Sequence, residues 1–534
     1  MRDAVQRTLI TPAAAFRDRR VLIVGLGRFG GGVGVTQWLV GQGARVTVTD
    51  IASAESLAES LGEFCGLNVT LELGGHETVD PGAFDLVVVN PAVNKRTSEF
   101  HARIVRSGVP RTTEMNLFCE RCTATVVGVT GTYGKSTTCA MLAHALQYAV
   151  MNQAAPFTAV HLGGNIGRSL LGELDAIRPS DVVVLEVSNA QLEDFPAITW
   201  RPQVAAITNL HPHHLDRYES FDEYAQAKLH LIGDSSRSTP VIVGELHPRA
   251  EELLRQAVGH HPGRIIRVKS PAAPMRLKVP GRHNHVNAAC ALTIGETLGL
   301  AESLVRDALP SFSGLSHRLE YVRTVDGVTY VNDSKSTAPA ATVIAVEAVM
   351  EEWEQPGRDH AEPRASSRAD SIPPSEPRAA PLDAKCQGSA RVDSSLQPAR
   401  QAFAKTTAGA SGSNGRRIVA IVGGQRKDVP LGECAGMLVR SCRAVVGMAE
   451  SGRAFTDAVR EAGGTADVLL AYEPDLPAAL RRARSAARPG DVILFSPGAP
   501  SFDQYVNFTA RGRHFVELVG AASTAPSASH AAGA

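Results

Sequence analysis

The sequence predicts an α/β protein built from three domains in succession, and three observations support this. The chain has 534 residues, more than a single hydrophobic core normally holds. Runs of β-branched apolar residues alternate with helix-length amphipathic segments, which is typical of parallel βαβ sheets. Two of these runs end in glycine-rich turns that lead into a helix, and such turns are ligand sites in doubly wound sheets.

The three predicted domains differ in their type of sheet. We expect a Rossmann-like domain at residues 1–118, a P-loop-type parallel sheet of the kind found in ATPases at 119–314, and a second Rossmann-like domain at 315–520. Residues 354–415 are rich in Pro, Ser, Ala and Arg and nearly free of aromatic residues. Such a segment predicts a disordered insertion, and residues 521–534 predict a disordered tail.

The composition argues against several classes of protein. Lys and Arg together number 54, as do Asp and Glu, so the formal net charge is zero and neither nucleic acid nor an anionic membrane is an expected partner. Neither a signal peptide nor a membrane span is expected, because the first residues contain no apolar h-region and no run of roughly 18 apolar residues follows. Eight cysteines in a chain of this length do not indicate a disulfide framework, which favours a reducing cytoplasm.

The first glycine-rich turn lies in the segment from Arg20 to Asp50, which predicts a strand, a turn, a helix and a second strand. Gly25, Gly27 and Gly30 fit the pattern G-x-G-x-x-G, and Asp50 ends the second strand. Taken alone, this fingerprint favours an NAD-dependent oxidoreductase. The pattern itself implies only a tight turn whose backbone can approach a diphosphate closely, followed by an acid placed to bind a ribose or a base.

The second glycine-rich turn is in the segment TVVGVTGTYGKSTT. An apolar strand ends in a loop with Gly131, Thr132 and Gly134, and Lys135-Ser136 then opens a helix. Backbone N–H groups at such a turn bind phosphate, the lysine reaches the β- and γ-phosphates, and the serine hydroxyl can ligate Mg²⁺. The upstream glycine is one place too early for the strict P-loop pattern, but the strand-to-helix context predicts a polyphosphate site.

Several polar residues follow predicted strands of the central domain. Glu186 lies near the end of one strand, and His214 follows another in the sequence HPHHLD. Because Mg²⁺ prefers oxygen ligands, Ser136 and Glu186 are the expected ligands, and zinc is not expected. From spacing alone, Lys228 on the next helix would be a solvated surface lysine. The residues by themselves therefore indicate an ATP-dependent enzyme with a second nucleotide-like site.

The chain resembles the Mur ligases, which form amide bonds in peptidoglycan assembly with ATP. The motifs TGTYGKST, GGNIG, LEVSNAQL, TNLHPHHLDRY, GRHNHVNAA, SHR, NDSKST, GGQRKD and SPGAPSFDQYVNF occur in the order typical of that family. Within the family, the sequence is similar to the members that add D-glutamate to UDP-N-acetylmuramoyl-L-alanine through an acyl phosphate. The resemblance implies a monomer with ATP and two Mg²⁺ ions, acting on these two substrates.

The resemblance also implies roles for individual residues. Those implied to bind the UDP substrate are Gly25, Gly27, Gly30, Asp50, Asn165 and Gln191. Those implied to bind ATP are Gly131, Thr132, Gly134, Lys135, Ser136, Thr137, Asn287, Arg318 and Asp333. Those implied to hold the metal are Ser136, Glu186, His214 and Lys228, the last as a carbamate formed with CO₂. Those implied to bind D-glutamate are Thr337, Lys427, Ser501, Phe502 and Phe508, and those implied to be catalytic are Lys135, Glu186, His214, Lys228 and Lys335.

Three alternatives remain open from the sequence. A Mur-type ligase could use another amino acid as acceptor, or the related folylpolyglutamate synthase chemistry could apply. An NAD-dependent oxidoreductase would use the first glycine turn but leave the second unexplained. A nucleotide-binding regulatory protein without catalysis would not need the full set of lysines and acids that the chain carries.

Overall fold

The computed structural model describes residues 16–27, 31–167, 169–213, 217–233, 239–259, 265–268, 275–353, 418–464 and 468–521. The predicted insertion at 354–415 and nearly all of the predicted tail lie outside these residues. So do Gly30 and His214, whose predicted roles stay predictions.

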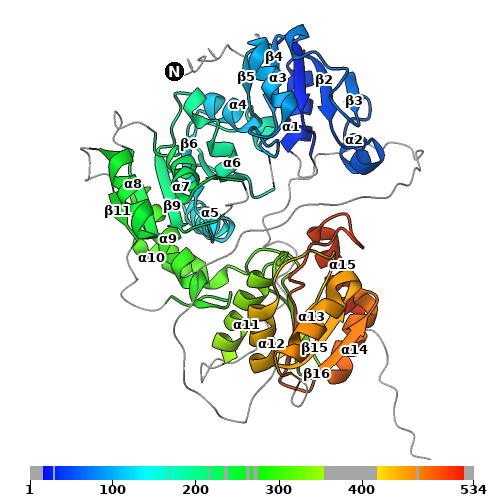
Figure 1. The fold of residues 1–534 in the computed structure, drawn as a ribbon. Helices are drawn as coiled ribbons and strands as arrows, with labels where there is room; N and C mark the ends of the chain where they lie inside the picture. The colour runs from blue at the N-terminus through cyan, green and yellow to red at the C-terminus, as the bar shows by residue number, and fades with distance from the viewer. Residues whose placement is uncertain are drawn as a thin grey trace, which may run out of the picture.

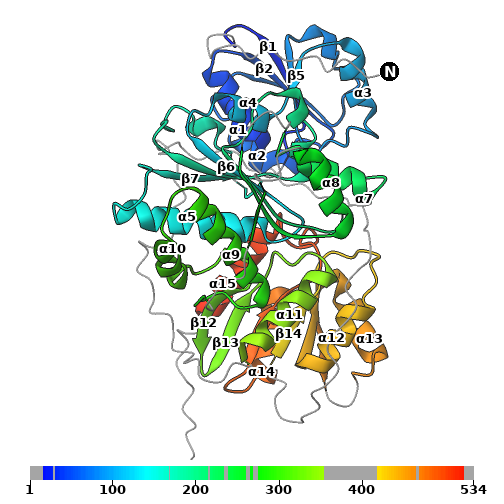
Figure 2. The ribbon, with the colours of Figure 1, turned by 90° about the vertical axis from the view of Figure 1, so that its left-hand side faces the viewer.

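The chain forms three β-sheets that follow one another along the molecule, and the predicted α/β class is confirmed (Figure 1). In both ribbon views the first and third sheets lie at opposite ends, with the second sheet between them (Figure 2). The domain boundaries drawn from the sequence stay predictions.

The first sheet is parallel, in the order β3-β2-β1-β4-β5. Its strands are β1 (Arg20–Val24), β2 (Arg45–Asp50), β3 (Val69–Leu73), β4 (Leu86–Val89) and β5 (Arg111–Thr112). Its helices are α1 (Gly31–Gly41), α2 (Ala58–Gly62), α3 (Glu99–Ser107) and α4 (Glu114–Arg121). The inner strands β1 and β4 are almost wholly apolar and buried, as expected for strands covered by helices on both faces.

The second sheet is also parallel, in the order β11-β10-β9-β6-β8-β7. Its strands are β6 (Thr125–Thr130), β7 (Val160–Gly164), β8 (Val182–Glu186), β9 (Val204–Leu210), β10 (Val241–Leu246) and β11 (Ile265–Arg267). Its helices are α5 (Lys135–Met151), α6 (Asn189–Leu192), α7 (Phe221–Leu229), α8 (Pro248–Val258), α9 (Arg282–Thr297) and α10 (Glu302–Ala308). Strands β6, β8 and β9 are neighbours, so the residues that follow them meet at one edge.

The third sheet has the order β12-β13-β17-β14-β15-β16 and is parallel except for β12. Its strands are β12 (Glu320–Val325), β13 (Val328–Asn332), β14 (Ile418–Val422), β15 (Cys442–Met448), β16 (Leu469–Glu473) and β17 (Val492–Phe495). Its helices are α11 (Pro339–Trp353), α12 (Gly432–Ser441), α13 (Ala449–Glu461), α14 (Leu476–Ala486) and α15 (Phe508–Ala521). A two-residue turn, Asp326-Gly327, joins β12 to β13, and both residues have positive φ angles, as this tight hairpin requires.

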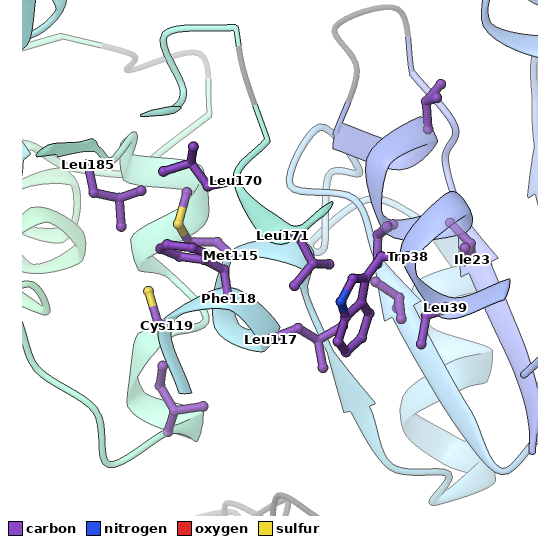
Figure 3. Close-up of a cluster of buried hydrophobic side chains, with 14 of the residues drawn as sticks. Ile23, Trp38, Leu39, Met115, Leu117, Phe118, Cys119, Leu170, Leu171 and Leu185 are labelled. Carbon is purple, nitrogen blue, oxygen red and sulfur yellow. The ribbon is translucent and has the colours of Figure 1, made fainter. Parts of the chain in front are cut away.

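Helix α4 connects the cores of the first two sheets. Its apolar side chains belong to a cluster of buried residues that includes members from both sheets. Leu117 points toward Trp38 of α1, whereas Met115 and Phe118 point toward the second sheet, where Leu185 of β8 lies (Figure 3). The third sheet packs around clusters of its own, whose buried members all come from residues 328–519.

Two further properties of the described residues concern the whole chain. No helix among them is both long and apolar enough to cross a membrane. No disulfide joins the seven cysteines that the structure describes.

Candidate active site

The loop between β6 and α5 is shaped by two glycines. Gly131 and Gly134 have left-handed φ angles of +153° and +76°. A Cβ atom on Gly131 would overlap the hydroxyl of Thr208, and one on Gly134 would overlap the side-chain oxygen of Asn287. Only glycine therefore fits both the backbone conformation and the space at these two positions.

Lys135 closes this loop on itself. Its Nζ donates hydrogen bonds to the carbonyls of Gly131 and Thr132 at 2.9 and 3.0 Å. The first N–H groups of α5, including that of Ser136, have no acceptor within the helix and lie at its positive end. Loop, ammonium and helix end together form a cradle whose donors suit an anion, and the predicted polyphosphate site stays a prediction.

Neighbouring elements brace the cradle. Asn287 of α9 accepts a hydrogen bond from Thr138 Oγ1 at 3.4 Å and is 4% exposed. Tyr224 of α7 donates from its hydroxyl to Thr132 Oγ1 at 3.1 Å. Asn287, which is predicted to bind ATP, thus contacts the first turn of α5, and Tyr224 contacts the loop before it.

Glu186 at the end of β8 has one carboxylate oxygen that the described residues leave without a partner. Oε1 accepts from Asn165 Nδ2 at 2.9 Å, whereas Oε2 is buried and accepts no hydrogen bond from them. Because a buried carboxylate oxygen normally has a partner, this atom is suited to a cation ligand. Asn165, predicted to contact the substrate, is therefore brought to the predicted metal residue.

Lys228 is not the solvated lysine that its spacing suggested. It is 1% exposed, its Nζ lies 5.0 Å from the centre of the Tyr224 ring, and it donates to Thr130 Oγ1 at 3.5 Å. Burial lowers the pKa of its amine well below the usual value, and the nearby Lys135 ammonium acts in the same direction. The uncharged amine is the form that this surrounding favours.

The segment between the second and third sheets reaches into the same site. Arg318 donates from Nη2 to Ser136 Oγ at 3.0 Å, across 182 positions of sequence. Asp333, at the end of β13, accepts from Leu319 N at 3.2 Å and from Ser496 Oγ at 2.8 Å. Burial raises the pKa of Asp333 to about 7.

Lys335 stands at the rim of the site with its Nζ 3.9 Å from the centre of the Phe508 ring. Although much of the side chain is exposed, its ammonium is poorly hydrated, and this lowers the pKa to about 8, with Arg318 acting in the same direction. Lys335 and Phe508 are both predicted site residues, and the structure brings them into contact.

Three cations (Lys135, Arg318 and Lys335) and the buried amine of Lys228 surround Glu186. Burial lowers the pKa values of Lys135, Lys228, Lys335 and Arg318, and in each case the Glu186 carboxylate opposes the shift. These residues come from both the second and the third sheet. Such an excess of positive charge around one acid suits a polyphosphate and the developing negative charge of phosphoryl transfer.

The residues predicted to bind D-glutamate follow strands of the third sheet. Thr337 follows β13, Lys427 follows β14, and Ser501 and Phe502 follow β17, three adjacent strands whose carboxyl ends meet at one edge. Ser501 is buried, whereas Thr337, Lys427 and Phe502 are exposed. This set belongs to the third sheet whereas the phosphate cradle belongs to the second, and Lys335 contacts Phe508 of the third sheet while the charges of Lys135 and Glu186 act on it.

The first glycine turn differs from the second in its electrostatics. Asp50 is 7% exposed, and its Oδ2 accepts from Leu26 N at 2.8 Å and from Gly27 N at 3.4 Å. Gly25 and Gly27 have the positive φ angles that the turn requires. The acid of the fingerprint thus binds the turn's own amides, and its predicted contact with the UDP substrate stays a prediction.

Two further predicted residues lie in the first turns of helices. Gln191 uses its side-chain oxygen to accept from the N–H and hydroxyl of Ser188 in a capping box. Thr137 lies in the first turn of α5, half-buried.

Sequence reasoning missed one buried charge in this region. Arg511 of α15 is completely buried. The available signal was its spacing, because Arg511 precedes Phe515 by one helical turn and so shares its buried face.

Comparison with known proteins identifies the family. A model of the Mur ligase middle domain matches residues 129–261. The chain is 32% identical to the UDP-N-acetylmuramoylalanine–D-glutamate ligase of Rubrobacter xylanophilus, over 94% of this chain and 98% of the relative. It is 30% identical to the enzyme of the same name from Symbiobacterium thermophilum, over 95% and 99% of the two chains.

A solved structure agrees at the level of the fold. The UDP-N-acetylmuramate–alanine ligase of Thermotoga maritima is 20% identical and superposes with a TM-score of 0.54, covering 94% of this chain and all of that one. Sequence identity over nearly the full length, rather than the fold alone, assigns the chain. It belongs to the family of the UDP-N-acetylmuramoylalanine–D-glutamate ligases, within the Mur ligases.

Proposed function

We propose that this chain joins D-glutamate to UDP-N-acetylmuramoyl-L-alanine at the expense of ATP. The terminal carboxylate of the muropeptide attacks the γ-phosphorus, ADP leaves, and the amine of D-glutamate then displaces phosphate from the acyl phosphate. The names of the relatives support the substrates. The observation that carries the reaction type is the meeting of the phosphate cradle, Glu186 and the cations of the third sheet in one site.

The residues fit a nucleotide triphosphate with its metal. The cradle of Lys135 and the first turn of α5 would hold the phosphates, and Asn287, Arg318 and Asp333 would contact the nucleotide. The buried Oε2 of Glu186 supports a metal at this site, because this oxygen has no other partner among the described residues. Ser136 and Glu186 would ligate it, and Mg²⁺ when bound supplies charge neutralisation to the transferred phosphoryl group.

Lys228 is proposed as a further metal ligand after carbamylation by CO₂. Its amine is buried and close to Glu186, so a carbamate formed there would place a carboxylate beside the same site. His214 would complete the set, and it lies outside the described residues. We expect two Mg²⁺ ions.

Each of the three sheets would bind a different substrate. The turn at Gly25 and Gly27, with Asn165 and Gln191, would hold the UDP muropeptide, and the carboxyl edge of the third sheet would hold D-glutamate. Lys335, between the cradle and that edge, would stabilise charge where the acyl phosphate meets the amine. We further expect a monomer that acts in the cytoplasm, where ATP is available.

The oxidoreductase alternative is not supported. The relatives are ligases, and the Asp50 carboxylate, which would bind the nicotinamide cofactor's ribose, is bonded to its own turn. A ligase that uses an amino acid other than D-glutamate is distinguished by the experiment that follows.

The test is phosphate release from ATP and Mg²⁺ with UDP-N-acetylmuramoyl-L-alanine, comparing D-glutamate with L-glutamate, L-alanine and meso-diaminopimelate. We expect release that requires both the muropeptide and D-glutamate. Release with a different amino acid alone would overturn the acceptor, and release with none would overturn the ligase activity.

A further inference from the structure

A fully buried arginine lies beneath the edge where β13, β14 and β17 end. Arg511, in the first turns of α15, is 0% exposed. The three adjacent strands send loops over this point: residues 333–337 after β13, 423–427 after β14 and 496–501 after β17. In open α/β sheets, ligands bind at such carboxyl ends.

The guanidinium of Arg511 ties two of these loops directly. Nε donates to Ser334 Oγ at 3.1 Å and Nη2 to the Ser334 carbonyl at 2.9 Å. Nη1 donates to the carbonyls of Ala499 and Pro500 at 3.0 and 3.1 Å. The rigid fork of the side chain thus fixes the loop after β13 relative to the loop after β17.

The loop after β14 packs against the carbonyl of Pro500, which the Arg511 guanidinium also binds. Gln425 N donates to the Pro500 carbonyl at 2.9 Å, so this oxygen accepts from both Gln425 and Arg511. A Cβ on Gly424 would overlap the Pro500 carbonyl and come within 2.9 Å of Arg511 Nη1. The glycine at 424 is therefore required chiefly by the close approach of the Pro500 carbonyl, the same oxygen that accepts from Arg511, so the loop after β14 is linked to the arginine through this carbonyl.

The charge of Arg511 is not neutralised by a close acid. All four of its hydrogen bonds go to uncharged oxygens, and among the described residues no ion pair joins it to a carboxylate. Asp333 and Asp503 act on it only at longer range, and although burial lowers its pKa to about 10, it stays charged at neutral pH. Burying a cation without a close counter-ion costs free energy that hydrogen bonds offset only in part, so its presence here points to a function.

We propose that Arg511 is a positioning residue of the acceptor site, which holds the three loops in register and places positive charge beneath them for an amino acid with two carboxylates. This deepens the proposed function and rests on it. Arg511 does not touch the acceptor, because it is fully buried and four of its five N–H donors bind Ser334, Ala499 and Pro500. It acts through the loops that carry Lys335 and Ser501.

The experiment measures KM for D-glutamate, ATP and UDP-N-acetylmuramoyl-L-alanine, together with kcat and the thermal midpoint. Arg511→Lys keeps the charge but cannot reach all four acceptors, and Arg511→Met removes the charge as well. Ser334→Ala removes the hydroxyl that accepts from Arg511 Nε and itself donates to the Phe508 carbonyl at 2.8 Å, and it serves if Arg511→Met does not fold. The matched control is Arg484→Lys, since Arg484 of α14 also donates to a hydroxyl and a carbonyl, those of Tyr330 and Leu518.

We expect Arg511→Lys to raise KM for D-glutamate by about tenfold or more, Arg511→Met by a larger factor and Ser334→Ala by a smaller one. KM for the other two substrates should change by less than about twofold, and Arg484→Lys should leave all three unchanged. A wild-type protein without D-glutamate-dependent activity would overturn both the proposed function and this inference. An active wild type, with KM for D-glutamate unchanged in the Arg511 and Ser334 variants or raised equally for all substrates, would overturn the inference alone.

Discussion

The two glycine-rich turns come from the same pattern of strand, turn and helix, yet they differ in charge. At the first turn, Asp50 accepts from the amides of Leu26 and Gly27, so a carboxylate of the chain itself occupies the donors. At the second turn, Lys135 binds the loop carbonyls, and the amides at the start of α5 point toward the site. A glycine motif therefore gives the shape of a turn, and the nearest charged side chain decides what it can bind.

The sharpest test of this comparison is the lysine of the second turn. Lys135→Met should lower kcat/KM by about a thousandfold, because the ammonium lies where negative charge develops in phosphoryl transfer. The free energy of unfolding should change by no more than about 1 kcal/mol, since only two hydrogen bonds to carbonyls are lost. Initial rates of phosphate release and urea denaturation measure the two effects.

The control for this variant is Lys278→Met, which removes an exposed lysine between β11 and α9. We expect it to leave both quantities unchanged. A similar loss of activity in the two variants, or an active Lys135→Met protein, would contradict the difference between the turns.

The second-largest effect is expected at Gly134. Gly134→Ala forces a left-handed φ angle on an L-residue and a clash with Asn287, so KM for ATP should rise by about ten- to a hundredfold. Gly172→Ala is the matched control, because a Cβ there meets no atom within 4 Å. Equal KM values for ATP in the two variants would show that the shape of the second turn does not matter.

The charge around the second turn also predicts a pH dependence. Because the pKa of Lys335 is lowered to about 8, its ammonium loses its proton as the pH rises through that value. Arginine stays charged throughout this range. The ratio of kcat for wild type to kcat for Lys335→Arg should therefore fall above pH 8, approaching about tenfold per pH unit. A ratio that is constant from pH 7 to 10 would exclude a role for the Lys335 charge.

The smallest effect on activity, and a clear effect on stability, is expected at the first turn. Asp50→Leu leaves the buried N–H of Leu26 without an acceptor and should lower the free energy of unfolding by about 1–3 kcal/mol. Asp50→Asn keeps one oxygen and should cost less. If Asp50→Leu unfolds at the same denaturant concentration as wild type, the acid does not hold the turn.

The sequence predicted the inner strands better than the edges of the sheets. Inner strands such as β6 and β17 are buried on both faces and appear as continuous apolar runs. Edge strands such as β12 and β16 contain exposed or polar positions and lack that signal. The hairpin that adds β12 antiparallel to the third sheet was therefore not foreseen, although its Asp-Gly turn was available as a sign.

The site could be predicted where residues follow strands, and not where distant segments meet. Glu186 ends β8 and Lys135 opens the helix that follows β6, and the structure brings the two residues together. The bond from Arg318 to Ser136 spans two sheets, and no periodicity in the sequence encodes it. Lys228 was expected on the surface from its spacing and is buried, because the packing of α7 against the phosphate loop overrides its polarity.

The most direct measurement of the central claim uses UDP-N-acetylmuramoyl-L-alanine with ¹⁸O in both oxygens of its terminal carboxylate. If the carboxylate attacks the γ-phosphorus and D-glutamate then displaces phosphate, each released phosphate must carry one labelled oxygen, detected by mass spectrometry. We predict this label, and its dependence on D-glutamate. Unlabelled phosphate, released while the amide product forms, would contradict an acyl phosphate, and phosphate released without the amide product would contradict the assignment as a ligase.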